Sequence, residues 1–152
     1  MIKIKNKKGG ISLIEAVISM GLFFVLAGIG VGAYFNYYKT SLLNDDINNA
    51  INLMKETRFN ALKNPGNSKY GVHIDLATKT ITGFRGETYD ALDGLNRTVL
   101  LQNAQLSNIN LQPTPGVTSD IIFSARTGKT ENTGSFQVGD YVISINAQGT
   151  ID

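Results

Sequence analysis

One carboxylate lies inside a long apolar stretch of this chain. Residues 11–38 read ISLIEAVISMGLFFVLAGIGVGAYFNYY, and Glu15 is the only charged residue among them. A carboxylate at membrane depth is costly, and such residues usually serve a function, often by pairing with a positive charge. The simpler explanation is an interfacial acid at a helix N-terminus, where the helix dipole favours negative charge. The residues that precede Glu15 weaken that simpler explanation.

Those residues form a short basic segment. Four lysines lie within the first eight residues, and Gly9-Gly10 separates them from the apolar stretch. From Ala16 to Tyr38 the chain has 23 uncharged residues. As a helix they reach about 35 Å, which exceeds the ~30 Å of a hydrocarbon core. Lysines on the N-terminal side alone predict a cytoplasmic N-terminus and an exported C-terminal domain.

Two other interpretations of the apolar stretch remain open. Gly30-Val31-Gly32 has the small residues of a signal-peptidase site, so the mature chain could begin at Ala33. The stretch is longer, however, than the ~7–15 apolar residues of a signal peptide. An uncleaved signal anchor would also satisfy the length and the lysines. Neither interpretation explains Glu15.

Residues 7–15, KKGGISLIE, resemble the leader and cleavage motif of the type IV prepilin family. The resemblance implies that a prepilin peptidase cuts after Gly10 and then N-methylates the new first residue, Ile11. It also implies that Glu15 serves assembly, by pairing with the N-terminal amine of a neighbouring subunit. The family usually has Phe after the cut, and many members have proline where this chain has Gly32. Ile11 and Gly32 are therefore departures from the pattern.

Composition limits the remaining function classes. The chain has 152 residues and no cysteine, so a single domain without disulfides or thiolate chemistry is expected. Its formal charge is +2, but ten basic and twelve acidic residues follow Gly10, which leaves a side-chain charge of −2. A chain of that sign has no general attraction for nucleic acid.

The apolar periodicity predicts that one helix runs from about Ser12 to Lys63 and ends at Asn64-Pro65-Gly66. Its outer half, residues 39–63, is amphipathic, with polar positions that include Asp45, Asp46, Lys55 and Glu56. Its apolar positions are Leu43, Ile47, Ala50, Ile51, Met54, Ala61 and Leu62.

Short alternating runs follow, and they predict β-strands. Tyr70 to Leu76 reads as a half-buried strand that forms a hairpin with Thr80–Phe84. Further strands are expected at residues 98–102, 109–112, 120–124, 134–138 and 140–146. We expect an α+β, pilin-like fold in which one antiparallel sheet packs on the outer half of the helix. The predicted segments are a leader at 1–10, a transmembrane and assembly segment at 11–38, the amphipathic helix at 39–63 and a β-rich domain at 64–152.

The C-terminal tail, residues 116–152, also resembles the H-type minor pseudopilins of type II secretion and their pilus relatives. Some of those relatives bind DNA through basic residues after the last glycine. Here Gly149 is followed only by Thr150, Ile151 and Asp152, which argues against DNA binding by this route.

Other chemical motifs are weak. Residues 127–130, TGKT, are similar to the end of a phosphate-binding loop, but the first glycine of that motif is missing. His73 is the only histidine and lies beside Asp75, which does not provide a metal site. Asp90 and Asp93 suggest a solvated turn more than a calcium loop. We therefore predict no catalytic residue, no metal site and no cofactor.

These observations predict a structural subunit, a minor pilin or pseudopilin of a type IV pilus or a type II secretion pseudopilus. Its expected partners are the prepilin peptidase, other pilins or pseudopilins in a helical filament, the inner-membrane assembly platform and membrane lipid. One alternative is a DNA-uptake (competence) pilin, which would need Arg85, Arg97, Arg126 and Lys129 to converge. Another is a signal-anchored exported binding domain, for which Glu15 would have no role.

Overall fold

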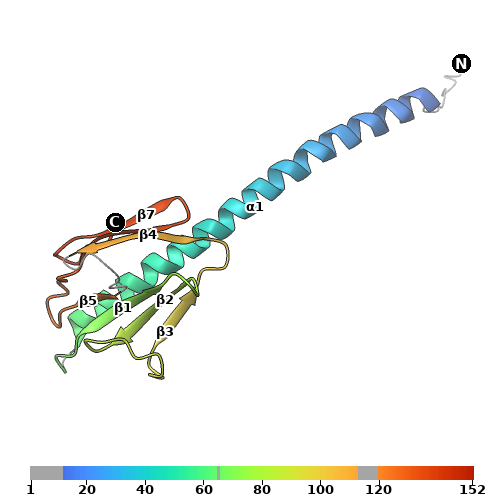
Figure 1. The fold of residues 1–152 in the computed structure, drawn as a ribbon. Coiled ribbons are helices and arrows are strands. Elements are labelled where there is room, and N and C mark those ends of the chain that lie inside the picture. Colours follow the sequence, from blue (N-terminus) through green and yellow to red (C-terminus); the bar gives the residue numbers. More distant parts are fainter. Residues whose placement is uncertain (1–11, 65, 113–119) are drawn as a thin grey trace, which may run out of the picture. The chain divides into compact units, whose positions relative to one another are not determined.

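A computed structural model describes residues 12–64, 66–112 and 120–152. Within them lies a long helix, α1 (Leu13–Lys63), which confirms the helix expected from the sequence (Figure 1). Glu15 lies in its first turn and Lys63 in its last, and both charges suit the helix dipole. After Lys63, the side-chain oxygen of Asn64 accepts a hydrogen bond from the backbone N–H of Gly66 at 2.9 Å. This local turn ends the helix.

The chain divides into two compact units after Lys39. In the first unit, every described residue is exposed, and every one except Ser12 is helical. The second unit begins at Thr40 and contains the outer half of α1 together with all the described strands.

The strands form two antiparallel sheets in place of the single sheet expected. Four strands form the first sheet in the order β3-β2-β1-β5, and three form the second in the order β4-β6-β7. Their bounds are β1 (Tyr70–Asp75), β2 (Thr80–Arg85), β3 (Arg97–Leu100), β4 (Leu106–Gln112), β5 (Asp120–Phe123), β6 (Thr133–Val138) and β7 (Tyr141–Ile145). The prediction of one sheet was wrong because β4 pairs with β6 and not with β3. Leu101 and Ala104, between β3 and β4, turn into the core and separate the two ladders.

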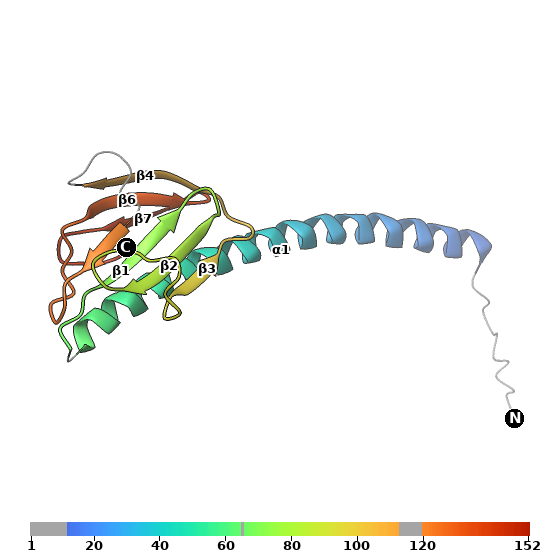
Figure 2. The same ribbon diagram turned by 60° about the horizontal axis from the view of Figure 1, so that its bottom comes forward.

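The outer half of α1 lies beside the strands of the second unit (Figure 2). This half of the helix and both sheets share one hydrophobic core. The helix contributes Ala50, Leu53, Met54 and Ala61, and each sheet contributes its inward-facing aliphatic and aromatic side chains. A glycine allows close contact between helix and sheet. A Cβ atom on Gly83 of β2 would lie 2.7 Å from Thr57 Oγ1 and 3.2 Å from Leu53 Cδ1. A larger residue there would push the helix away from the first sheet.

The apolar periodicity of the sequence predicts the buried side of the helix only in part. Ala50, Met54 and Ala61 are buried as expected, but Leu62 is 38% exposed. Likewise Leu76 is 48% exposed, because it follows the last residue of β1. Leu53 and Thr57 are buried instead, which rotates the core-facing side of the helix relative to the prediction.

Asp46 is the main correction on the helix. It was expected among the polar positions, away from the apolar side of the helix, yet it is only 6% exposed. Its Oδ2 atom accepts hydrogen bonds from the backbone N–H groups of Asn103 and Ala104, at 2.6 Å and 2.8 Å. The carboxylate therefore holds the segment between β3 and β4, where the chain leaves the first sheet for the second.

Candidate assembly and membrane surface

The first unit presents a large apolar surface. Between Leu13 and Tyr38, the large apolar side chains of the helix are 50% to 85% exposed. A water-soluble protein rarely leaves so much contiguous apolar surface uncovered. The core helix of a soluble protein would have most of these side chains buried, whereas here none is. The surface requires an apolar environment, which a bilayer or neighbouring apolar helices can provide.

This part of α1 is long and apolar enough to cross a membrane, and it lies near the N-terminus. The chain thus has one candidate membrane-spanning helix in its described residues. The helix continues without interruption through Gly28, Gly30 and Gly32. A Cβ atom added at any of these glycines would contact nothing within 4 Å, so their bare surface is open to a neighbouring helix.

Glu15 is exposed on the first turn of this helix. The first backbone N–H groups of a helix lack helical partners, and they favour an anion nearby. Gly10 and Ile11, the expected cleavage and methylation positions, lie outside the described residues. Of the three predicted site residues, the structure therefore places only Glu15.

Aromatic side chains mark the other end of the apolar segment. Tyr34, Tyr37 and Tyr38 are all at least half exposed, and the rings of Tyr34 and Tyr38 stack with centroids 6.3 Å apart. They follow Glu15 by about 19–23 residues, which corresponds to about 30–35 Å along a helix. That spacing matches a hydrocarbon core with Glu15 at one interface and an aromatic belt at the other.

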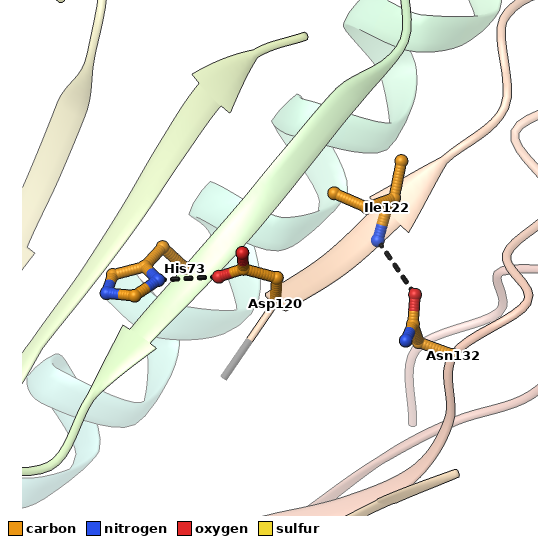
Figure 3. Close-up of polar contacts among 4 residues, drawn as sticks. All are labelled: His73, Asp120, Ile122 and Asn132. Atoms are coloured by element: carbon orange, nitrogen blue, oxygen red, sulfur yellow. Dashed lines mark hydrogen bonds and ion pairs between the residues drawn. The ribbon is translucent and has the colours of Figure 1, made fainter. Parts of the chain in front are cut away.

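The second unit contains a polar cluster that sequence analysis missed. His73 of β1 and Asp120 of β5 are directly paired across the first sheet, and His73 Nδ1 lies 2.5 Å from Asp120 Oδ1 (Figure 3). The ring of Tyr89 stacks on the His73 imidazole with a centroid distance of 3.9 Å. Asp75, the expected neighbour, instead accepts hydrogen bonds from the backbone N–H groups of Ala77 and Thr78. A hydrogen bond from the Thr78 side chain, together with these two backbone bonds, lowers the pKa of Asp75.

A histidine–aspartate pair can orient an imidazole for catalysis or for metal binding. Among the described residues, however, no group of three His, Cys, Asp or Glu side chains could hold a metal ion. The side-chain oxygen of Asn132 also accepts a hydrogen bond from the backbone N–H of Ile122 at 3.4 Å (Figure 3). Both contacts fasten β5 to its surroundings, so we read the cluster as structural.

The basic residues that the DNA-uptake alternative requires fall into two groups. Arg97 forms an ion pair with Glu56 of α1. These two residues and Arg85 line one cleft beside the helix. Arg126 and Lys129 lie instead on the turn between β5 and β6, where Gly128 contacts Arg58 and Leu62 of the helix. The same turn contains the TGKT residues, and no helix follows it.

Comparison of the chain with protein-family models, with curated proteins and with solved structures gave no match. The architecture itself is plain. One long N-terminal apolar helix packs its outer half against antiparallel sheets, in the α+β arrangement typical of pilins.

Proposed function

We propose that this chain is a structural subunit of a type IV pilus or of a type II secretion pseudopilus. It would be made as a membrane prepilin, cut after Gly10 by a prepilin peptidase and assembled through its N-terminal helix. The chain would then be the substrate of an enzyme and not an enzyme. The observation that carries the proposal is a combination of two features: a lone Glu15 on the first turn of an exposed apolar helix, and the sequence KKGG at residues 7–10, shortly before that helix.

Assembly would bring together two opposite charges, each of which is costly when left unpaired in an apolar environment. Cleavage after Gly10 would create a free amine at Ile11, four residues before the Glu15 carboxylate. When a subunit joins the filament, its amine pairs with Glu15 of a neighbour. At ~4 Å and an effective dielectric of ~20 the attraction is about 4 kcal/mol, before desolvation costs are subtracted. Pairing neutralises both charges within a bundle of apolar helices and fixes the axial register.

The apolar segment would serve two successive environments. Before assembly, the bilayer covers the exposed side chains between Leu13 and Tyr38. After assembly, the helices of neighbouring subunits cover them, and lipid is released. The lysines of the leader would keep the N-terminus in the cytoplasm, so that the second unit is exported. The assembly platform of the inner membrane would drive the transfer.

Fractionation tests this proposal. Cells that express the full chain with its filament system are sheared, and polymer is separated from membranes by centrifugation. We expect the chain in the polymer fraction, and only in the membrane fraction when the prepilin peptidase gene is deleted. A chain that stays in the membrane in both strains would favour the anchored binding domain instead.

A further inference from the structure

The loop between β2 and β3 exposes two leucines. Leu92 is 92% exposed and Leu95 is 71% exposed, although both belong to a hydrogen-bonded turn. Asp90 Oδ1 accepts a hydrogen bond from the backbone N–H of Leu92, and Asp93 Oδ1 accepts one from Leu95, each at 2.9 Å. Asn96 closes the loop by donating from its side-chain amide to the carbonyl oxygen of Asp90. The loop therefore holds its leucines outward in a fixed conformation.

The same loop is acidic. Glu87, at its start, is paired with Lys69 at 2.9 Å, and this pairing raises the pKa of Lys69. Asp90 and Asp93 form no ion pair with any described residue. We call residues 90–95 the acidic leucine loop. Exposed leucines flanked by unpaired carboxylates suit a partner surface that is apolar and basic.

Such a surface exists on the outer half of α1. A cleft of about 240 Å³ is lined by Phe59, Leu62 and Ile151, with Lys55 and Arg58 beside them. This volume exceeds the ~150 Å³ that suffices for benzene, so a leucine side chain fits. Phe59 is half exposed, and the Lys63 ammonium lies 4.4 Å from the centre of its ring. We call this site the basic cleft.

The cations of the basic cleft differ in their availability. Arg58 donates hydrogen bonds to the carbonyl oxygens of Gly128 and Gln148, so its guanidinium holds two turns together. Lys55 and Lys63 are exposed and pair with no carboxylate in the described part of the chain. These two lysines are therefore the available positive charges at the rim.

The loop and the cleft lie on different flanks of the helix. Leu95 shares a cleft with Glu56 and Asn60, whereas the basic cleft is lined by Lys55 and Phe59. The two clefts share no lining residue, so the loop does not reach the basic cleft of its own chain. A contact between loop and cleft therefore joins two copies of the chain.

We propose that the acidic leucine loop of one copy docks in the basic cleft of a second copy. Leu92 or Leu95 would pack on Phe59 and Leu62, while the loop carboxylates face Lys55 and Lys63. Because two different surfaces meet, the contact is heterologous and leaves a free loop and a free cleft at the ends. Repeating it extends a chain of subunits. The inference rests on the proposed function, since a filament requires an open contact of this kind.

Crosslinking between introduced cysteines tests the contact. The chain has no native cysteine, so only the introduced thiols can react. The full chain carrying both Leu92→Cys and Leu62→Cys is treated in membranes with a short bis-maleimide. We expect a ladder of dimers, trimers and longer species. Either single variant should remain monomeric, because each copy then offers only one side of the contact. Absence of the ladder would overturn the inference, and so would equal dimer formation by a single variant, which indicates a two-fold contact.

A double-mutant cycle then tests the charges. Asp90→Asn with Asp93→Asn keeps both turn acceptors but removes both charges, and we expect about fivefold less ladder. Lys55→Met with Lys63→Met should have a similar effect, and combining the four changes should add little. Asp140→Asn, at an exposed acid outside the loop, is the control. Fully additive effects would show that the two surfaces do not meet. Retention on double-stranded DNA that only the lysine changes abolish would assign the cleft to nucleic acid and overturn the docking.

The same samples separate the two proposals. N-terminal sequencing shows whether the chain was cleaved after Gly10, and the ladder shows whether the loop of one copy contacts the cleft of another. A chain that begins at Ile11 but gives no ladder contradicts only the docking. A chain that begins at Met1 contradicts the proposed function, whatever the ladder shows.

Discussion

Replacing Glu15 by Gln is expected to leave cleavage after Gly10 intact but to lower incorporation into filaments by about 100-fold. Glutamine has nearly the same shape as glutamate, so the helix and its apolar surface are unchanged. The variant cannot neutralise the Ile11 amine of its neighbour. An uncompensated charge inside a helix bundle costs about 3–5 kcal/mol, and even the lower value exceeds a hundredfold in an equilibrium constant.

The measurement compares the polymer and membrane fractions of wild type and variant, with the N-terminus sequenced in both. Ser19→Ala is the matched control, because it changes a polar residue one turn further along the same apolar segment. We expect the control to be incorporated normally. Wild-type incorporation of the Gln variant would show that Glu15 is an interfacial acid with no role in assembly.

Replacing Asp46 by Ala is expected to lower the free energy of unfolding of the second unit by about 2–4 kcal/mol. The change leaves two backbone N–H groups without an acceptor, that of Ala104 in a buried position and that of Asn103 in a partly buried one. Removing one partner from a buried hydrogen bond costs about 1–3 kcal/mol, and Asp46 serves two. The loss falls on the segment that connects the two sheets.

Denaturant unfolding of the full chain in detergent, followed by the circular dichroism of the β-rich unit, measures this loss. Asp45→Ala is a close control, because Asp45 is the adjacent residue and is exposed. It should change the unfolding free energy by less than about 0.5 kcal/mol. Equal effects at both positions would contradict the structural role of Asp46.

Much of the fold could be predicted because its signals are local. The helix was recognised from a continuous apolar run followed by an amphipathic one, and Asn64 supplies a turn where it ends. β1 alternates between apolar and polar residues, and only three residues, Ala77 to Lys79, separate its expected range from that of the next strand, which is the spacing of a hairpin. Patterns of this kind depend on neighbours in the sequence, which a reader of the sequence sees directly.

The division into two sheets could not be predicted, because strand pairing is a long-range property. Alternation indicates that β4 exists, but nothing in it distinguishes β3 from β6 as its neighbour. Asp46 was misplaced for the same reason, since its partners lie 57 and 58 residues away. Likewise, His73 and Asp120 meet across 47 residues.

The candidate site shows the same contrast. Glu15 was found from the sequence because a single charge in an apolar run is a local signal. The basic cleft combines helix residues such as Phe59 with Ile151 near the C-terminus, so only the folded chain brings it together. The exposed leucines of the acidic leucine loop were equally invisible, because a loop sequence does not reveal which side chains point outward.

The central claim is that this chain is a processed prepilin, and one measurement tests it most directly. The protein is isolated from membranes of cells with and without prepilin peptidase, and its intact mass and N-terminal sequence are determined. We predict a chain that begins at N-methylated Ile11 in the first case and retains residues 1–10 in the second. A chain that begins at Met1 in both, or at Ala33 after a signal-peptidase cut, would contradict the account.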